Sequence, residues 1–215
     1  VKSFLPPILL IFLVLGSIVL GIATPSEAAS LGVFGAVFIS SIQKQLNFNI
    51  INNCSKETIK LTSMIFMILI GATLFSLVFR GLNGEEVIQS ILLNDSVDKF
   101  FTLLIILSLM FLLGFILDFI EIIFIIIPIF GPILFTLGFD PIWIGILIGM
   151  ILQTSFLTPP FGFSIFYLRG VAPNNIDTIE IYKGVLPFVF IQLLVVFLII
   201  LIPGLATLLP SIILN

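Results

Sequence analysis

The scarcity of charged side chains is the feature that most limits what this chain can fold into. Only 9% of its 215 residues are charged, 60% are hydrophobic, and the mean hydropathy is +1.38. A water-soluble domain carries charges at about a quarter of its positions to cover its surface. We therefore expect an all-α membrane protein, because helices satisfy their own backbone hydrogen bonds inside a lipid bilayer.

The residue types that carry most enzyme and metal chemistry are rare. The sequence has no histidine, which is the commonest general base and metal ligand, and Cys54 is its only cysteine. It shows no glycine-rich phosphate loop and no hydroxyl nucleophile paired with a base. The net charge of −3 is spread out, which indicates no nucleic-acid partner. We expect neither an enzyme nor an organic cofactor.

Apolar runs of about 20 residues predict where the chain crosses the bilayer. We expect four spanning helices, at residues 4–23, 25–42, 61–79 and 185–209. The first run is too long for the apolar part of a signal peptide, and no small-residue cleavage site follows it. We therefore interpret the start at Val1 as a truncation.

The middle of the sequence departs from this pattern. Residues 100–137 contain two short apolar arms joined by an acidic tip at Asp118, which predicts a re-entrant hairpin. Residues 142–168 contain Pro159 and Pro160, which must break the helix because both lack a backbone donor. Freed backbone groups are tolerated in membranes only where protein or water covers them. The hairpin tip and the broken helix are therefore the predicted functional site.

The distribution of basic residues predicts the orientation. If residues 43–60 are cytoplasmic, six of the eight basic residues lie inside and the acidic loop at 80–99 lies outside. Two full spans in place of the hairpin would put Arg169 and Lys183 outside, so the re-entrant interpretation is favoured. The C-terminus is then periplasmic.

Thr24 and Glu27 have two possible roles. Thr24 can cap a helix that starts at Pro25, and Glu27 at the third helical position can complete a capping box. The alternative is that Glu27 binds a cation, since acids in membrane segments are usually functional. We favour the capping box.

Asp118 and Glu121 at the hairpin tip allow the same two interpretations. Asp118 could be the N-cap of the second arm, and Glu121, three residues later, the acid at its third position. An acid at membrane depth is costly unless it is paired or hydrated, and a bound cation would relieve Asp118 directly. Both roles stay open for Asp118 and are compatible, whereas Glu121 is the weaker candidate.

A cluster of side-chain oxygens precedes the two prolines. Gln153, Thr154 and Ser155 supply an amide and two hydroxyls, and Thr158 adds a third hydroxyl beside carbonyls freed by the helix break. Sodium is bound by such oxygens, including carbonyls at unwound helices. The alternative is a proline-kinked helix whose hydroxyls only satisfy freed backbone groups. We favour an ion site, with Gln153 and Thr154 linked to substrate or ion.

Four blocks of sequence resemble the large membrane subunit of the TRAP transporters (tripartite ATP-independent periplasmic, DctM type). They are GIATPSEAA at 21–29, LGFILD at 113–118 followed by IPIFGP at 127–132, FLTPPFG at 156–162, and FSIFYLRGVAP at 163–173. The last block is similar to the branch labelled mannitol or chloroaromatic compound type.

The resemblance implies a sodium-coupled secondary transporter that imports carboxylates across the bacterial inner membrane by an elevator mechanism. The family's large subunit contains two inverted repeats and is about twice as long, so residues 1–215 are similar to its C-terminal half and the N-terminal half would be missing. Implied partners are that missing half, a periplasmic substrate-binding protein and a small four-helix membrane subunit within the lipid bilayer.

The resemblance also implies a sodium site, with Na⁺ as the coupling ion. Its ligands would be main-chain oxygens near Gly114, Ser155, Thr158 and Phe161, with the Thr158 hydroxyl nearby. Ser155 stands where many members of the family have glycine, and a carbonyl ligand survives that change.

Two other functions stay open. One is a non-transporting membrane scaffold or a fragment of a split gene, and the other is a channel or a permease subunit of another transporter class. An upstream reading frame that encodes the first repeat would favour the carboxylate transporter. A neighbouring ATPase gene would favour an ATP-driven permease.

Overall fold

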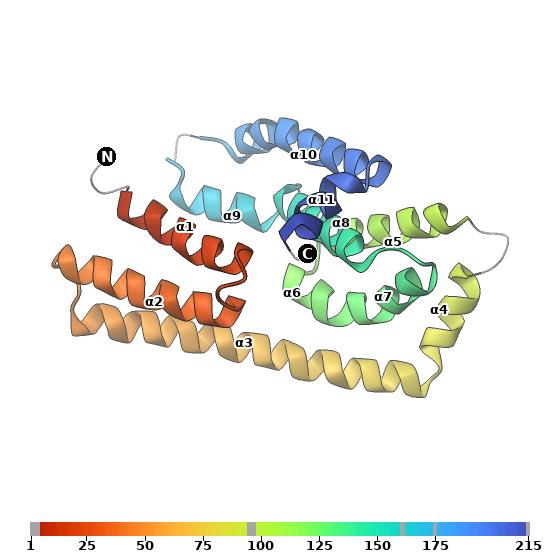
Figure 1. The fold of residues 1–215 in the computed structure, drawn as a ribbon, viewed down its shortest axis with the longest axis horizontal. Helices are drawn as coiled ribbons and strands as arrows, with labels where there is room; N and C mark the ends of the chain where they lie inside the picture. Colours follow the sequence, from red (N-terminus) through yellow and green to blue (C-terminus); the bar gives the residue numbers. More distant parts are fainter. Residues whose placement is uncertain (1–4, 94–97, 160–161, 174–175, 214–215) are drawn as a thin grey trace. The chain divides into compact units, whose positions relative to one another are not determined.

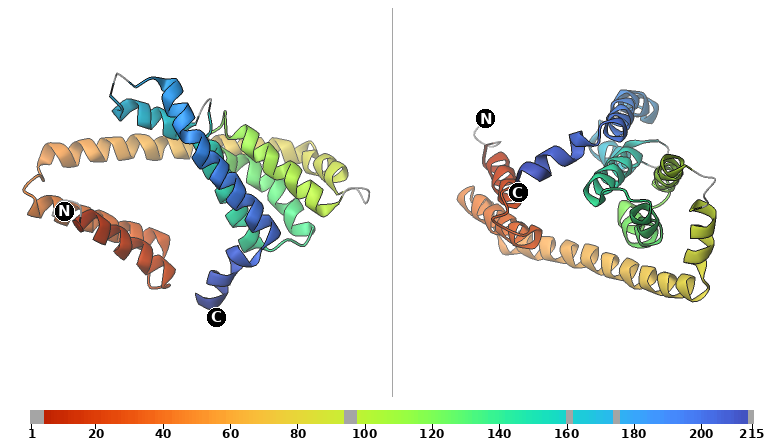
Figure 2. Two further views of the ribbon diagram at one scale, coloured as in Figure 1. Left: turned by 90° about the horizontal axis from the view of Figure 1, so that it is seen from above. Right: turned by 45° about the vertical axis from the view of Figure 1, so that its right-hand side comes forward.

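The chain is helical through most of the part that its computed structural model describes, namely residues 5–93, 98–159, 162–173 and 176–213, and no strand occurs there. Figures 1 and 2 show the helices in colours that follow the chain from the N-terminus to the C-terminus. The chain divides into two units, one of residues 1–63 with 211–215 and the other of residues 64–210. Each unit is described separately.

The first unit begins with an antiparallel helix pair, α1 (Leu5–Val19) and α2 (Pro25–Ile42) (Figure 1). Helix α1 is shorter than the expected span at 4–23. It ends early because the amides of Ile22 and Ala23 both donate to the carbonyl of Ser17, at 2.9 Å and 3.1 Å, which turns the chain towards α2.

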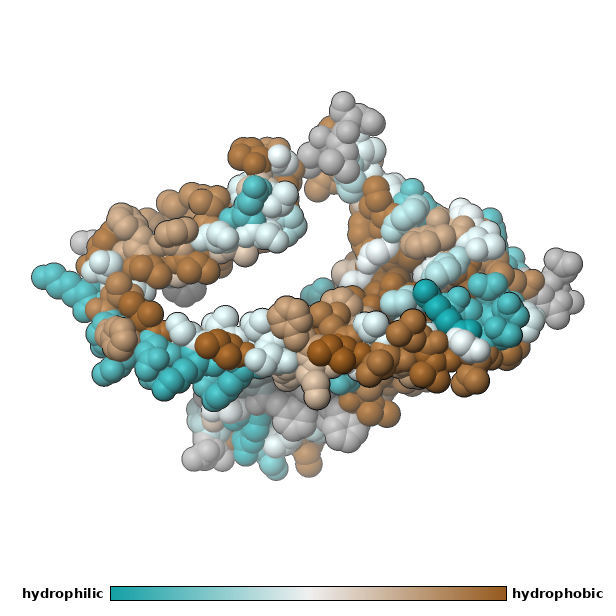
Figure 3. Space-filling view, turned by 90° about the horizontal axis from the view of Figure 1, so that it is seen from below, coloured by the Kyte–Doolittle hydropathy of each residue, from teal (hydrophilic) through white to brown (hydrophobic). Residues whose placement is uncertain are grey.

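Helix α3 (Phe48–Gly81) is 34 residues long and continues from the first unit into the second. The expected span at 61–79 lies within this helix, which begins 13 residues earlier, in the segment 43–60 that we expect to be cytoplasmic. The Asn47 side chain caps the helix by accepting the Ile50 amide at 2.9 Å, and neither proline nor glycine interrupts residues 48–70. Figure 3 shows hydrophilic residues on the N-terminal end of this helix and hydrophobic ones further along.

Helix α8 (Pro141–Leu157) forms the centre of the second unit. It packs between α5 (Lys99–Leu113) and α10 (Thr178–Leu201) (Figure 2). Their apolar side chains form one buried cluster, which includes Leu103, Ile106, Met110, Ile144, Leu147, Ile151, Val196 and Ile199. The helix that carries the predicted oxygen cluster is therefore covered on two sides.

The expected hairpin at 100–137 is a helical pair. Its first arm is α5, and its second arm runs through α6 (Phe119–Glu121), η1 (Ile122–Ile126) and α7 (Ile127–Thr136) without a break. The π-helical turn η1 lies directly before Pro128, where the ring would crowd an α-helical turn and the amide hydrogen is missing. Helix α5 measures about 22 Å, whereas a hydrocarbon core is about 30 Å thick.

Two further boundaries differ from expectation. The expected outside loop at 80–99 contains a short helix, α4 (Gly84–Leu92). The span expected at 185–209 lies earlier, because Asp177 caps α10 by accepting the Thr178 amide at 3.0 Å and Pro203 ends it. A separate helix, α11 (Gly204–Ile213), follows.

Four helical segments in the described part of the chain are long and apolar enough to cross a membrane. They are Pro25–Ile42, Phe48–Gly81, Phe119–Thr136 and Thr178–Leu201, while α1, α5 and α8 are shorter apolar helices. Most of their large apolar side chains are exposed, which suits a lipid solvent.

A hydrogen bond between α8 and α10 compensates for Pro203. The carbonyl of Ile199 would accept an amide four residues later, but that residue is proline. The indole Nε1 of Trp143 donates to this carbonyl instead, at 2.9 Å and fully buried. An orphaned acceptor is thereby satisfied across the helix interface.

We expect Trp143→Phe to destabilise the protein by about 1–3 kcal/mol, because it leaves the Ile199 carbonyl unpaired in the interior. In a Pro203→Ala background the cost should fall, since the alanine restores the missing amide donor. Unfolding equilibria in mixed micelles measure both costs. Equal costs in the two backgrounds would contradict the proposed compensation.

Candidate functional site

The break after α8 has a local cause. Helix α8 ends at Leu157, Thr158 is extended with φ −87° and ψ 131°, and α9 (Phe163–Val171) begins after the break. A residue before proline is pushed out of the helical region, and Pro159 lacks an amide hydrogen. Pro160 and Phe161, the latter a predicted ligand, lie outside the described residues.

The three predicted hydroxyls all donate to carbonyls of the preceding turn. Thr154 Oγ1 donates to Met150 at 2.7 Å, Ser155 Oγ to Leu152 at 2.9 Å, and Thr158 Oγ1 to Thr154 at 2.6 Å. Only the Thr158 bond serves a carbonyl freed by the break, because the Thr158 amide donates to the Ser155 carbonyl at 3.1 Å instead of to Thr154. Each hydroxyl oxygen keeps its lone pairs, so it can still accept a hydrogen bond or coordinate a cation.

Backbone carbonyls gather around Gly162. A Cβ at this position would lie 2.9 Å from the Thr158 oxygen and 3.0 Å from the Phe156 oxygen. Only glycine lets the chain pass these oxygens, and Gly162 is buried. Ser164 Oγ donates to the Phe156 carbonyl at 3.2 Å, so α9 is tied back to the end of α8.

The hairpin turn meets the end of α8 at one tight contact. Gly114 caps α5 and is buried, and a Cβ there would lie 2.6 Å from the Cβ of Ser155. The Ser155 side chain, 2% exposed, fills the space that a side chain at 114 would need. The structure thus brings together Gly114 and Ser155, two residues that the family resemblance placed in one site.

Asp118 begins the second arm of the hairpin. Its carboxylate accepts the Phe119 amide at 2.7 Å, so it does form a helix cap. Among the described residues no basic side chain pairs with it. Glu121 makes no capping hydrogen bond.

Gln153 lies on the exposed side of α8, away from the three hydroxyls. It lines a groove of about 290 Å³ together with Phe119, Ile123 and Phe156. The rings of Phe119 and Phe156 contact each other edge to face, with centroids 6.1 Å apart. Gln153 therefore faces the arm that Asp118 caps.

Thr24 and Glu27 form reciprocal hydrogen bonds at the start of α2. The Glu27 carboxylate accepts the Thr24 amide at 2.8 Å, and Thr24 Oγ1 accepts the Glu27 amide at 3.4 Å. The Thr24 hydroxyl also donates to that carboxylate at 2.8 Å. Both residues belong to the first unit, whereas the broken helix belongs to the second.

Sequence reasoning expected freed carbonyls near Thr158 but missed the role of Gly162 beside them and the steric contact at Gly114. The glycine directly after the Pro-Pro-Phe run was the available signal for the first, because crowded backbone favours glycine. The second is a contact between distant segments that no local pattern reveals. No group of three acidic, histidine or cysteine side chains that could hold a metal occurs in the described residues.

The fold and this junction define a multi-pass α-helical membrane protein in which two interrupted helical elements meet inside the helix bundle. The chain belongs to the family of the DctM component of tripartite ATP-independent periplasmic transporters, whose family model matches residues 1–205. With its four apolar helical segments, this membership makes it a multi-pass inner membrane protein of a transport family rather than an enzyme.

Two of the relatives are TRAP transporter permeases. The chain is 32% identical over 184 residues to the isethionate TRAP transporter permease protein DctMQ of Oleidesulfovibrio alaskensis, which covers 85% of this chain and 29% of that protein. It is 26% identical over 205 residues to the C4-dicarboxylate TRAP transporter large permease protein DctM of Rhodobacter capsulatus, covering 95% and 46%.

A third relative is the protein YgiK of Salmonella typhimurium, 30% identical over 211 residues. That match covers 98% of this chain and 48% of the relative. The chain therefore spans about half the length, or less, of these curated relatives.

We expect Gly114→Ala to lower stability by about 1–3 kcal/mol, because the added methyl overlaps the Ser155 side chain. The double variant Gly114→Ala/Ser155→Gly should regain most of this loss, since it removes the overlapping atoms. Thermal unfolding in detergent measures both.

Gly149→Ala is the matched control, because a Cβ at 149 meets no atom within 4 Å. It should leave the melting temperature close to that of the wild type. A double variant as unstable as Gly114→Ala alone would show that the overlap is not the cause.

Proposed function

We propose that the chain is the C-terminal half of the large subunit of a sodium-coupled transporter that imports an organic acid. The contact of the hairpin turn with the broken helix at Gly114 and Ser155 carries the proposal. The hairpin turn and the broken helix supply backbone oxygens, some of which have no helical hydrogen bond. Transporters build ion sites in the bilayer from such oxygens. Membership of the DctM family supports the transport class.

The oxygens at this junction suit a hard monovalent cation. The Thr158 hydroxyl gives its proton to the Thr154 carbonyl, so its lone pairs are available to a cation. The carbonyls of Phe156 and Thr158 lie close together around Gly162. In this proposal Na⁺ binds main-chain oxygens near Gly114, Ser155, Thr158 and Phe161. The Asp118 carboxylate, which has no basic partner among the described residues, lowers the cost of the ion's charge.

The groove beside Gln153 supports a role next to the ion site. Its amide is the polar group in an otherwise apolar groove between α8 and the second hairpin arm. We assign the substrate, an organic acid, to this side of the junction. Two relatives are named for isethionate and C4-dicarboxylate, which are both organic acids.

The proposal includes three protein partners. They are the N-terminal half of the large subunit, a small four-helix membrane subunit and a periplasmic substrate-binding protein. The junction lies within the second unit, and in the proposed elevator mechanism this unit carries the site while the first unit anchors it. The C-terminus is proposed to be periplasmic.

We expect Thr158→Val to raise the sodium concentration for half-maximal uptake about fivefold, equivalent to about 1 kcal/mol for one lost oxygen. The assay uses proteoliposomes with the complete transporter. Thr136→Val is the control, because Thr136 Oγ1 donates to the Pro132 carbonyl at 2.9 Å in the same i−4 pattern. Unchanged sodium dependence in Thr158→Val would remove this hydroxyl from the proposed site.

The re-entrant hairpin predicts opposite sides for α4 and the start of α10. In a Cys54→Ser background, Glu86→Cys should react with an impermeant thiol reagent from the periplasm. Glu180→Cys should react only after the membrane is permeabilised. Both positions are exposed, so access to the side chain does not limit the reaction. Labelling of both from one side would contradict the re-entrant hairpin.

A further inference from the structure

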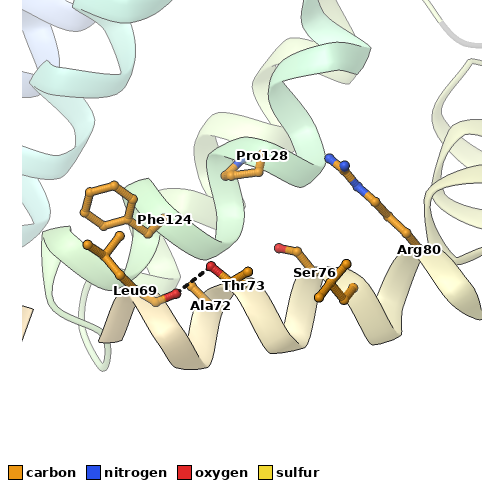
Figure 4. Close-up of a pocket in the computed structure, with 8 residues that line it drawn as sticks. Leu69, Ala72, Thr73, Ser76, Arg80, Phe124 and Pro128 are labelled. Carbon is orange, nitrogen blue, oxygen red and sulfur yellow. Dashed lines mark hydrogen bonds between the residues drawn. The ribbon is translucent and has the colours of Figure 1, made fainter. Parts of the chain in front are cut away.

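A second concave site lies on the other side of the hairpin. It is a groove of about 260 Å³ between the C-terminal half of α3 and the segment that carries Phe124 and Pro128 (Figure 4). Leu69 and Leu77 supply further apolar walls, and Ser76 and Arg80 supply polar groups. The proposed transport site does not use any of these residues.

Arg80 marks the depth of the groove in the bilayer. It directly follows the apolar run at 61–79, so its guanidinium lies where the hydrocarbon ends and the lipid phosphates begin. Figure 4 shows its side chain reaching from α3 towards the helix that carries Pro128. The apolar part of the groove therefore extends from the membrane surface into the hydrocarbon.

The guanidinium of Arg80 is only partly used within the protein. Its Nε donates to Glu85 Oε1 at 2.7 Å, and its terminal nitrogens have no acceptor among the described residues. Glu85 lies in the first turn of α4, where the amide ends of the helix offset part of its negative charge. The terminal nitrogens thus remain a positive, fork-shaped donor set that suits a phosphate.

Ser76 lies one helical turn below Arg80, about 6 Å deeper along α3. Its hydroxyl has no hydrogen-bond partner among the described residues, and Figure 4 shows its oxygen directed into the groove on the side of Pro128. The ester groups of a lipid lie about this far below its phosphate. From Arg80 to Leu69 the groove covers about 16 Å of helix, which accommodates most of an acyl chain.

We propose that this groove binds one phospholipid. Its phosphate accepts hydrogen bonds from the terminal nitrogens of Arg80, its ester region lies beside Ser76, and one acyl chain lies against Leu77, Leu69 and Phe124. A small free anion fits less well, because the walls below Arg80 are apolar and burying a charged group there is costly. The lipid would fill the space between α3 and the second hairpin arm.

Native mass spectrometry of the delipidated chain, titrated with phosphatidylglycerol, tests the proposal. One lipid should bind more tightly than diacylglycerol of the same chain length, which lacks the phosphate. Arg80→Gln should weaken the binding of phosphatidylglycerol about fivefold. Ser76→Leu should weaken both ligands by filling the groove. Gly71→Leu adds the same side chain at an open position outside the groove and should leave binding unchanged.

Glu85→Gln separates lipid binding from a purely structural ion pair. Both Arg80→Gln and Glu85→Gln break the pair, but only the first removes the donors to phosphate, so Glu85→Gln should retain or strengthen binding. Equal losses in these two variants would overturn the proposal, as would equal affinity for diacylglycerol. Displacement of the lipid by inorganic phosphate would identify an anion site instead, and no bound lipid would exclude the site.

Discussion

The need to satisfy every backbone polar group without water governs this structure. Hydrocarbon offers no donors, so each proline inside an apolar helix creates a carbonyl that another part of the protein must serve. Pro203 and Pro159 show two different outcomes of this requirement. At Pro203 the indole of Trp143 replaces the missing amide donor, so the Ile199 carbonyl is hydrogen-bonded. At Pro159 the helix ends instead: the Ser155 carbonyl accepts the Thr158 amide at 3.1 Å, and the carbonyls of Phe156 and Thr158 gather around Gly162.

The difference between these two sites explains why function is assigned to one of them. The bond from Trp143 joins α8 to α10 and uses up the orphaned acceptor. Near the break at Thr158, Ser155 contacts a second turn at Gly114, and the proposed ion site uses the backbone oxygens of these two elements. A helix that is anchored at its start and open at its end can hold oxygens in place for a ligand.

Sequence reasoning reached furthest where local chemistry decides the structure. Pro159 fixes the end of α8, and the capping residues fix the start of α2, because both effects act within one helical turn. The starts of α3 and α10 were missed, since hydropathy measures which residues enter the bilayer and not where a helix ends in water. The contact of Gly114 with Ser155 joins residues far apart in the chain, so only packing reveals it.

The π-helical turn η1 sets the phase of the second hairpin arm. A π-turn holds one residue more than an α-turn, so everything after Ile126 is rotated by about 100° relative to an unbroken helix. Ile122 is buried within the turn, and Ile129, Ile133 and Leu134 are buried after it. The loss of one residue from the turn would therefore rotate the rest of the arm by about 100° and change which of its side chains face the interior.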